Sequence, residues 1–179
     1  SGILWRPFII GIAMILIFTL TRISLLIYTG YEYITFGLFL LIFLKGLLFD
    51  IIASLFLLSP FFIYEVFFRG RAAGRLRKIF SVIALWMFFS FILFIAVAEF
   101  VFWIEFSTRF NFIAVDYLLY THEVIGNIFQ SYPVGWIFSG IALLAALITY
   151  ILLPLLSKGK RYKPAPVSVL LCLLMSMLF

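Results

Sequence analysis

The sequence predicts an all-α membrane protein with about five transmembrane helices, the last truncated, plus amphipathic helices at the outer interface. Hydrophobic residues make up 66% of the 179 residues and charged residues only 11%, against about 45–50% and about 25% in soluble domains. The mean hydropathy is +1.28. Charged residues mostly lie between long apolar runs, and a helix of about 20 apolar residues spans a bilayer. These observations exclude a soluble protein.

The first two apolar runs differ in length. Residues 7–28 fit one span, which begins at a proline, and the first turn of a helix tolerates proline. Residues 34–68 would form a helix about 50 Å long at ~1.5 Å per residue, against a hydrocarbon core of about 30 Å. We therefore expect two pieces, namely a separate interfacial helix at 36–45 and a span at 48–68, with a bend near Gly46.

Three further runs complete the expected topology. Residues 79–103 and 134–156 are each long enough to cross the bilayer. The last run, 167–179, gives only about 20 Å of helix, which is too short to span a core of about 30 Å. We therefore expect a fifth helix that is cut off in the membrane, and a chain that is the membrane part of a longer protein.

The basic residues predict the orientation of the helices. If the spans alternate, ten of the thirteen Lys and Arg residues fall on one face: Arg6, five from Arg69 to Lys78, and four from Lys158 to Lys163. The positive-inside rule makes that face cytoplasmic, so we expect a multi-pass protein of an inner (cytoplasmic) membrane with a cytoplasmic N-terminus. The chain has a net charge of +6, and its basic residues cluster beside the membrane spans. This position indicates that they bind anionic phospholipid rather than nucleic acid.

The catalytic inventory of the sequence is small. It holds one histidine, His122, and one cysteine, Cys172, with no Cys-x-x-Cys, no His-x-x-x-His and no glycine-rich phosphate loop. A lone histidine is more often a hydrogen-bonded structural residue than a ligand or base, although it can serve either role. We expect no catalytic residue, metal site or cofactor in this stretch alone.

Four ionisable residues lie in apolar surroundings: Arg22, Lys45, Asp50 and Glu99. Charge is expensive inside a membrane, so such residues pair, face a cavity or reach the interface. We expect Asp50 to meet Arg22 or Lys45 near the outer boundary, and Glu99 to take part in similar structural pairing. The alternative is a lipid-headgroup site that Arg22 and Lys45 share.

Residues 105–133 form a less hydrophobic, aromatic-rich segment between two spans. If residues 113–128 are helical, four polar side chains follow i, i+4, i+7 and i+11 spacing and share one face: Asp116, Tyr120, Glu123 and Asn127. This pattern predicts an amphipathic helix on the outer membrane surface, with aromatic anchors at headgroup depth.

Two functions fit this outer helix. It can be a shelf for a lipid headgroup, with Arg109 and Asn111 as phosphate donors and Asp116 and Glu123 holding the shelf in place. It can also be a lid that seals the bundle and supports a following domain. The candidate headgroup ligands from this segment are Arg109, Asn111, Tyr120 and His122.

The stretch from Arg109 to Pro133, RFNFIAVDYLLYTHEVIGNIFQSYP, resembles the outer loop before the fourth span of bacterial lipoteichoic acid synthase-like proteins of the sulfatase/alkaline phosphatase superfamily. The Gly46-Leu-Leu-Phe-Asp50 stretch is similar to the Gly-x-x-x-Asp of that family's second span. The resemblance implies five spans followed by a large extracytoplasmic catalytic domain. It also implies transfer of phosphoglycerol from phosphatidylglycerol, or of a related headgroup such as phosphoethanolamine, by a threonine beside a divalent metal, usually manganese, in that domain.

We therefore expect the membrane domain of a phosphoglycerol-type transferase, which anchors the extracytoplasmic domain and presents the donor lipid. The alternative is a stand-alone membrane scaffold or lipid-binding protein. A small transporter fits less well, because the sequence holds no inverted repeat and no matching pair of glycine-interrupted spans.

Overall fold

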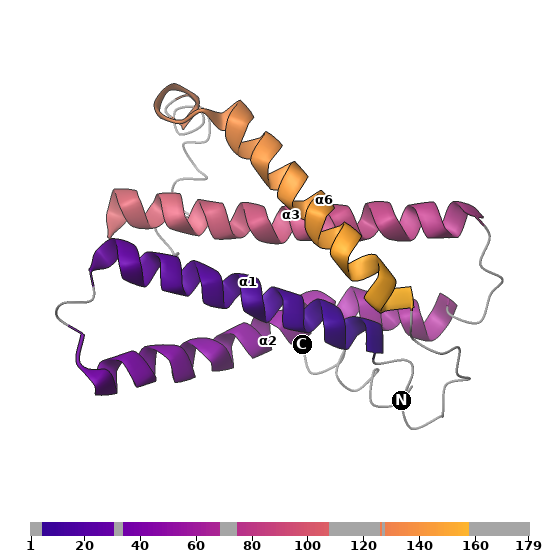
Figure 1. The fold of residues 1–179 in the computed structure, drawn as a ribbon, viewed down its shortest axis with the longest axis horizontal. Helices are drawn as coiled ribbons and strands as arrows, with labels where there is room; N and C mark the ends of the chain where they lie inside the picture. The colour runs from indigo at the N-terminus through magenta and orange to yellow at the C-terminus, as the bar shows by residue number, and fades with distance from the viewer. Residues whose placement is uncertain (1–4, 31–33, 69–74, 108–125, 127, 158–179) are drawn as a thin grey trace. The chain divides into compact units, whose positions relative to one another are not determined.

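A computed structural model of the chain describes residues 5–30, 34–68, 75–107, 126 and 128–157 (Figure 1). These residues are mostly helical, and each of the main helices holds an apolar stretch long enough to cross a bilayer. The expected class, an all-α membrane protein, is confirmed. The helices are α1 (Trp5–Thr29), α2 (Phe36–Phe68), α3 (Arg75–Phe106) and α6 (Val134–Ser157).

Three of these helices contain the spans expected from the sequence, and α2 departs from the expectation. It is one α-helix of 33 residues, so the expected separate helix at 36–45 and the break near Gly46 are wrong. A glycine inside a helix costs only about 1 kcal/mol, whereas broken backbone hydrogen bonds are costly in lipid. The expected fifth span at 167–179 and nearly all of the outer helix at 113–128 lie outside the described residues.

The chain divides into two compact units, Ser1–Ser81 with Tyr150–Phe179, and Val82–Thr149. In the first unit, α1 and α2 lie side by side and run in opposite directions (Figure 1). The face that α2 turns to α1 is buried at every fourth position: Gly46, Asp50, Ser54 and Leu58. A Cβ at Gly11 of α1 would come within 3.1 Å of Leu58 Cδ1. Small residues therefore allow close packing here, as is common between membrane helices.

The same unit contains a cap on the C-terminal end of α6. The Trp5 indole Nε1 donates to the carbonyl of Leu155 at 3.0 Å, and Arg6 Nε donates to the carbonyl of Leu156 at 3.1 Å. The last carbonyls of a helix have no partner within the helix, and they carry partial negative charge. The first residues of α1 thus satisfy acceptors that would otherwise be left to water or headgroups.

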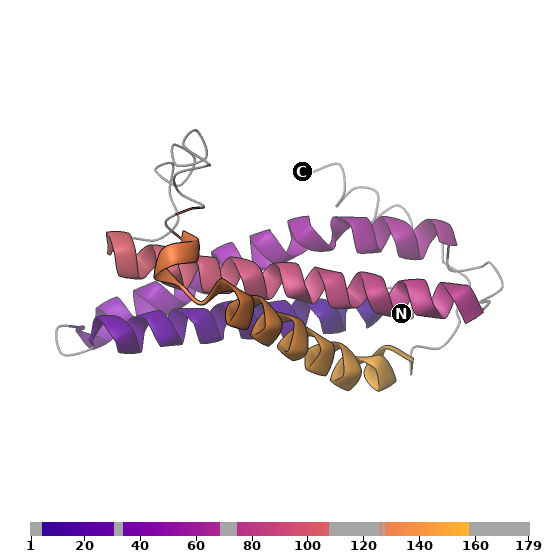
Figure 2. The ribbon, with the colours of Figure 1, turned by 90° about the horizontal axis from the view of Figure 1, so that it is seen from above.

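In the second unit, α6 runs obliquely across α3 in the view of Figure 1, and Figure 2 shows the two helices from above. The Trp86 indole Nε1 of α3 donates to the carbonyl of Ala142 of α6 at 3.0 Å. The rings of Phe94 and Phe138 stack with centroids 5.8 Å apart and an interplanar angle of 21°, a favourable offset for aromatic pairs. The buried apolar side chains of this unit include Leu85, Phe89, Ile92, Ile141 and Ala145.

Candidate functional site

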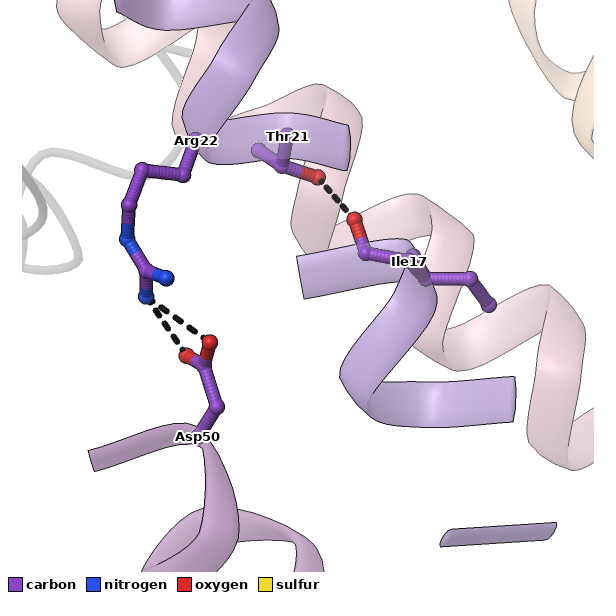
Figure 3. Close-up of polar contacts among 4 residues, drawn as sticks. All are labelled: Ile17, Thr21, Arg22 and Asp50. Atoms are coloured by element: carbon purple, nitrogen blue, oxygen red, sulfur yellow. Dashed lines mark hydrogen bonds and ion pairs between the residues drawn. The ribbon is translucent and has the colours of Figure 1, made fainter. Parts of the chain in front are cut away.

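The first site is a buried ion pair between α1 and α2 (Figure 3). Arg22 Nη2 donates to both oxygens of Asp50, at 2.9 Å to Oδ1 and 2.8 Å to Oδ2. The two side chains are only 7% and 9% exposed. The expectation that Asp50 meets a cation is confirmed, and of its two candidate partners the structure selects Arg22.

The face of α2 beneath Arg22 is shaped to hold its guanidinium. Phe43, Gly46 and Asp50 follow i, i+3, i+7 spacing, so they share one face of the helix. The Arg22 Cζ lies 5.9 Å from the centroid of the Phe43 ring, within the range of a cation–π interaction. A Cβ at Gly46 would overlap the guanidinium. We call these three residues the Arg22 seat. Phe43 contacts the guanidinium with its ring, Gly46 leaves space for it, and Asp50 accepts its hydrogen bonds.

The Arg22 seat was only partly visible in the sequence. The Gly-x-x-x-Asp spacing marked Gly46 and Asp50, but Gly46 was interpreted as a hinge and Phe43 was not singled out. The signal that could have found the seat is an aromatic residue, a glycine and an acid on one face of a span, opposite an arginine in the preceding span.

Lys45 does not join Arg22. It is exposed on α2, and five residues at 100° each place it about 140° around the helix from Asp50. Arg22 instead has its positive charge neutralised by Asp50. The structure therefore does not assemble the headgroup site that Arg22 and Lys45 were expected to share as the alternative.

The second site lies where the segment between α3 and α6 begins and ends. The Tyr132 hydroxyl donates to Glu105 Oε1 at 2.6 Å, and both residues belong to the second unit. α3 ends in a left-handed residue, Ser107, at φ 52°, whose N–H donates to the carbonyl of Trp103 at 2.8 Å. We call the Tyr132–Glu105 contact the clasp, because it holds together the two ends of a segment of the chain.

Of the remaining residues that the sequence assigned to a site, only Glu99 lies in the described part of the chain. Glu99 is half-buried on α3. The others lie outside the described residues: Arg109, Asn111, Asp116, Tyr120, His122 and Glu123. Their expected roles stay predictions.

A metal such as manganese, which the resemblance implies for the catalytic domain, has no fitting ligands in the described part of this chain. Within residues 5–30, 34–68, 75–107 and 126–157 apart from 127, no group of three or more His, Cys, Asp and Glu side chains could hold a metal ion. Metal sites of hard cations require several converging oxygen ligands.

Comparison of the chain with family models, with curated proteins and with solved structures finds no match. The described geometry establishes a helical membrane architecture with a buried ion pair between Arg22 and Asp50 and a hydrogen bond between Tyr132 and Glu105.

Proposed function

We propose that the chain is the membrane domain of a phosphoglycerol-type lipid-headgroup transferase in the inner membrane of a bacterium. In this proposal its N-terminus is cytoplasmic, and it anchors an extracytoplasmic, metal-dependent catalytic domain and presents the donor lipid, an anionic phospholipid such as phosphatidylglycerol. The proposal is supported by the resemblance of residues 109–133 and of the Gly46–Asp50 stretch to lipoteichoic acid synthase-like proteins.

The observation that carries the proposal is the clasp between Tyr132 and Glu105. The resembling stretch follows Ser107, the last described residue after α3, and ends at Pro133, which directly precedes α6. The clasp joins its two flanks at the ends of two membrane-spanning helices, where lipid headgroups lie. A segment whose flanks are joined at this level can serve as a headgroup shelf.

The chemistry of the proposed reaction divides between the two domains. The catalytic domain breaks the phosphodiester bond between the phosphate and the diacylglycerol oxygen, takes up the phosphoglycerol and passes it to an acceptor, so diacylglycerol stays in the bilayer. The membrane domain holds the donor phosphate in reach. A guanidinium makes bidentate hydrogen bonds to a phosphate, and Arg109 is the residue that we assign to this contact.

The test uses the full-length protein in vesicles of phosphatidylethanolamine and fluorescent phosphatidylglycerol. Arg109→Ala should lower the release of fluorescent diacylglycerol and spare the hydrolysis of a soluble phosphodiester, because only the lipid donor needs the shelf. Lys78→Ala, which removes an exposed positive charge at the other end of α3, is the matched control and should change neither rate.

Three results would overturn the proposal. If the full-length protein releases no diacylglycerol from phosphatidylglycerol or phosphatidylethanolamine, the chain belongs to a scaffold or a lipid-binding protein instead. If Arg109→Ala lowers both activities equally, or lowers neither in a folded protein, Arg109 is structural and the segment is a lid.

A further inference from the structure

An apolar groove lies between α3 and α6 in the second unit. It encloses about 300 Å³ and is lined by Trp86, Ser90 and Phe94 from α3 and by Phe138, Ile141 and Ala142 from α6. Ser90 supplies the only hydroxyl of this set. A volume of this size falls at the lower end of the range for ligand pockets.

The charges on α3 place the groove at a definite depth in the bilayer. Lys78 and Glu99 bracket an uncharged run, and 21 residues at ~1.5 Å correspond to about 32 Å, close to the ~30 Å hydrocarbon core. Measured along α3 from Glu99, Phe94 lies about 8 Å deep and Trp86 about 20 Å deep. Since one leaflet contributes about 15 Å of hydrocarbon, the groove runs from inside the Glu99-side leaflet to just past the midplane.

The rim of the groove favours a flexible chain over a helix. The rings of Phe91, Phe94 and Phe138 are 53%, 43% and 53% exposed. Helices pack in membranes through small residues that let backbones approach, and a helix with its side chains is about 10–12 Å wide. Protruding rings keep a helix of that width away from the buried lining residue Ile141, whereas an acyl chain can lie between them.

We propose that this groove binds one acyl chain of a phospholipid of the leaflet on the Glu99 side, so that the headgroup of that lipid lies beside the clasp. The groove lining then holds the hydrocarbon, and the phosphate lies near the end of α3 and the start of α6. The identification of this lipid as the donor rests on the proposed function, whereas occupancy of the groove does not.

The groove is tested by photocrosslinking of the full-length protein in nanodiscs that contain phosphatidylglycerol with a diazirine in the middle of one acyl chain. Mass spectrometry should find the crosslinks concentrated on the peptides of Trp86–Phe94 and Phe138–Ala142. Crosslinks that are spread evenly over the lipid-facing surfaces of all described helices would overturn the proposal, and this readout needs no variant to fold.

Filling the groove gives the second arm of the test. Ala142→Phe adds a ring to the lining of the groove and should lower crosslinking on these peptides roughly tenfold, equivalent to about 1.4 kcal/mol of lost binding. Ala84→Phe is the matched control, because Ala84 is exposed on α3 and lies about 160° around the helix from Trp86. It should leave the yield unchanged.

The two proposals fail separately. Unchanged crosslinking in a folded Ala142→Phe protein overturns the groove, whatever the enzyme activity is. A native mass spectrum that shows dimers, with crosslinks missing from the groove, assigns it to a second copy of the chain and also overturns the proposal. Absence of diacylglycerol release together with groove-specific crosslinks overturns only the transferase.

Discussion

Removing either partner of the Arg22–Asp50 pair should destabilise the α1–α2 hairpin strongly, and removing both should restore most of the loss. The side chains are 7% and 9% exposed, so solvent screens the pair little. Breaking a buried pair typically costs about 3–5 kcal/mol, because the remaining charge is left without a partner, and apolar replacement of both partners is often neutral. Each of Arg22→Leu and Asp50→Leu should therefore cost about 3 kcal/mol or more, and the double variant should recover to within about 1 kcal/mol of the parent.

The free energy of unfolding can be measured by titrating SDS into mixed micelles and following tryptophan fluorescence. A loss of 3 kcal/mol raises the unfolding equilibrium constant by more than about a hundredfold, well within the resolution of the assay. Lys45→Leu, which removes an exposed charge from α2, is the control and should not destabilise the protein. The reasoning is refuted if Asp50→Leu costs less than about 1 kcal/mol, or if the double variant is as unstable as the sum of the single variants.

Two further predictions follow from the Arg22 seat and the clasp. Gly46→Val should lower the free energy of unfolding by about 1–3 kcal/mol, because its side chain overlaps the Arg22 guanidinium, which must shift away from Asp50. Gly37→Val, where a Cβ meets nothing within 4 Å, is the same change without the overlap, and an equal loss in both variants would contradict the seat. Tyr132→Phe removes the donor to Glu105 and should speed protease cleavage between the two residues in vesicles, with an unchanged SDS midpoint. An unchanged cleavage rate would show that the clasp does not hold the segment.

The sequence predicted those features that depend on composition and on the cost of charge in lipid. The apolar runs located α1, α3 and α6, because each run is bounded by charged or turn-forming residues. The partner of Asp50 was narrowed to two cations, because an isolated carboxylate is expensive in an apolar environment. The choice of Arg22 over Lys45 required the rotation of α2 relative to α1, which hydrophobicity alone does not define when most faces of a helix are apolar.

The continuous α2 shows why the length argument failed. It assumed that a helix ends where the hydrocarbon ends, but the backbone hydrogen bonds of a helix persist beyond that boundary because breaking them gains nothing. Gly46 appeared to be a suitable hinge since glycine is a poor helix former. In the structure its missing side chain makes room for Arg22.

Contacts between distant parts of the chain were out of reach of sequence patterns. Glu105 and Tyr132 are 27 residues apart, and Trp5 and Leu155 are 150 residues apart. Periodicity reports only which residues share a face of one element. These contacts depend on where two helix ends meet in space. Where the acceptor is a backbone carbonyl, as at Leu155, its residue type gives no sign of the contact, because every residue has such a carbonyl.

The unbroken α2 is also longer than the bilayer core is thick. Its 33 residues correspond to about 50 Å at ~1.5 Å per residue, against a hydrocarbon core of about 30 Å. Its apolar stretch, Phe36–Phe61, starts at the first residue of the helix, where the nine residues from Phe36 to Leu44 carry no charge. They are all apolar apart from one glycine, and Phe36 is 74% exposed. Water is a poor solvent for such a surface, and a helix longer than the hydrocarbon core is accommodated by tilting or by local thickening of the bilayer. We therefore expect α2 to tilt in the membrane or to thicken the bilayer around it.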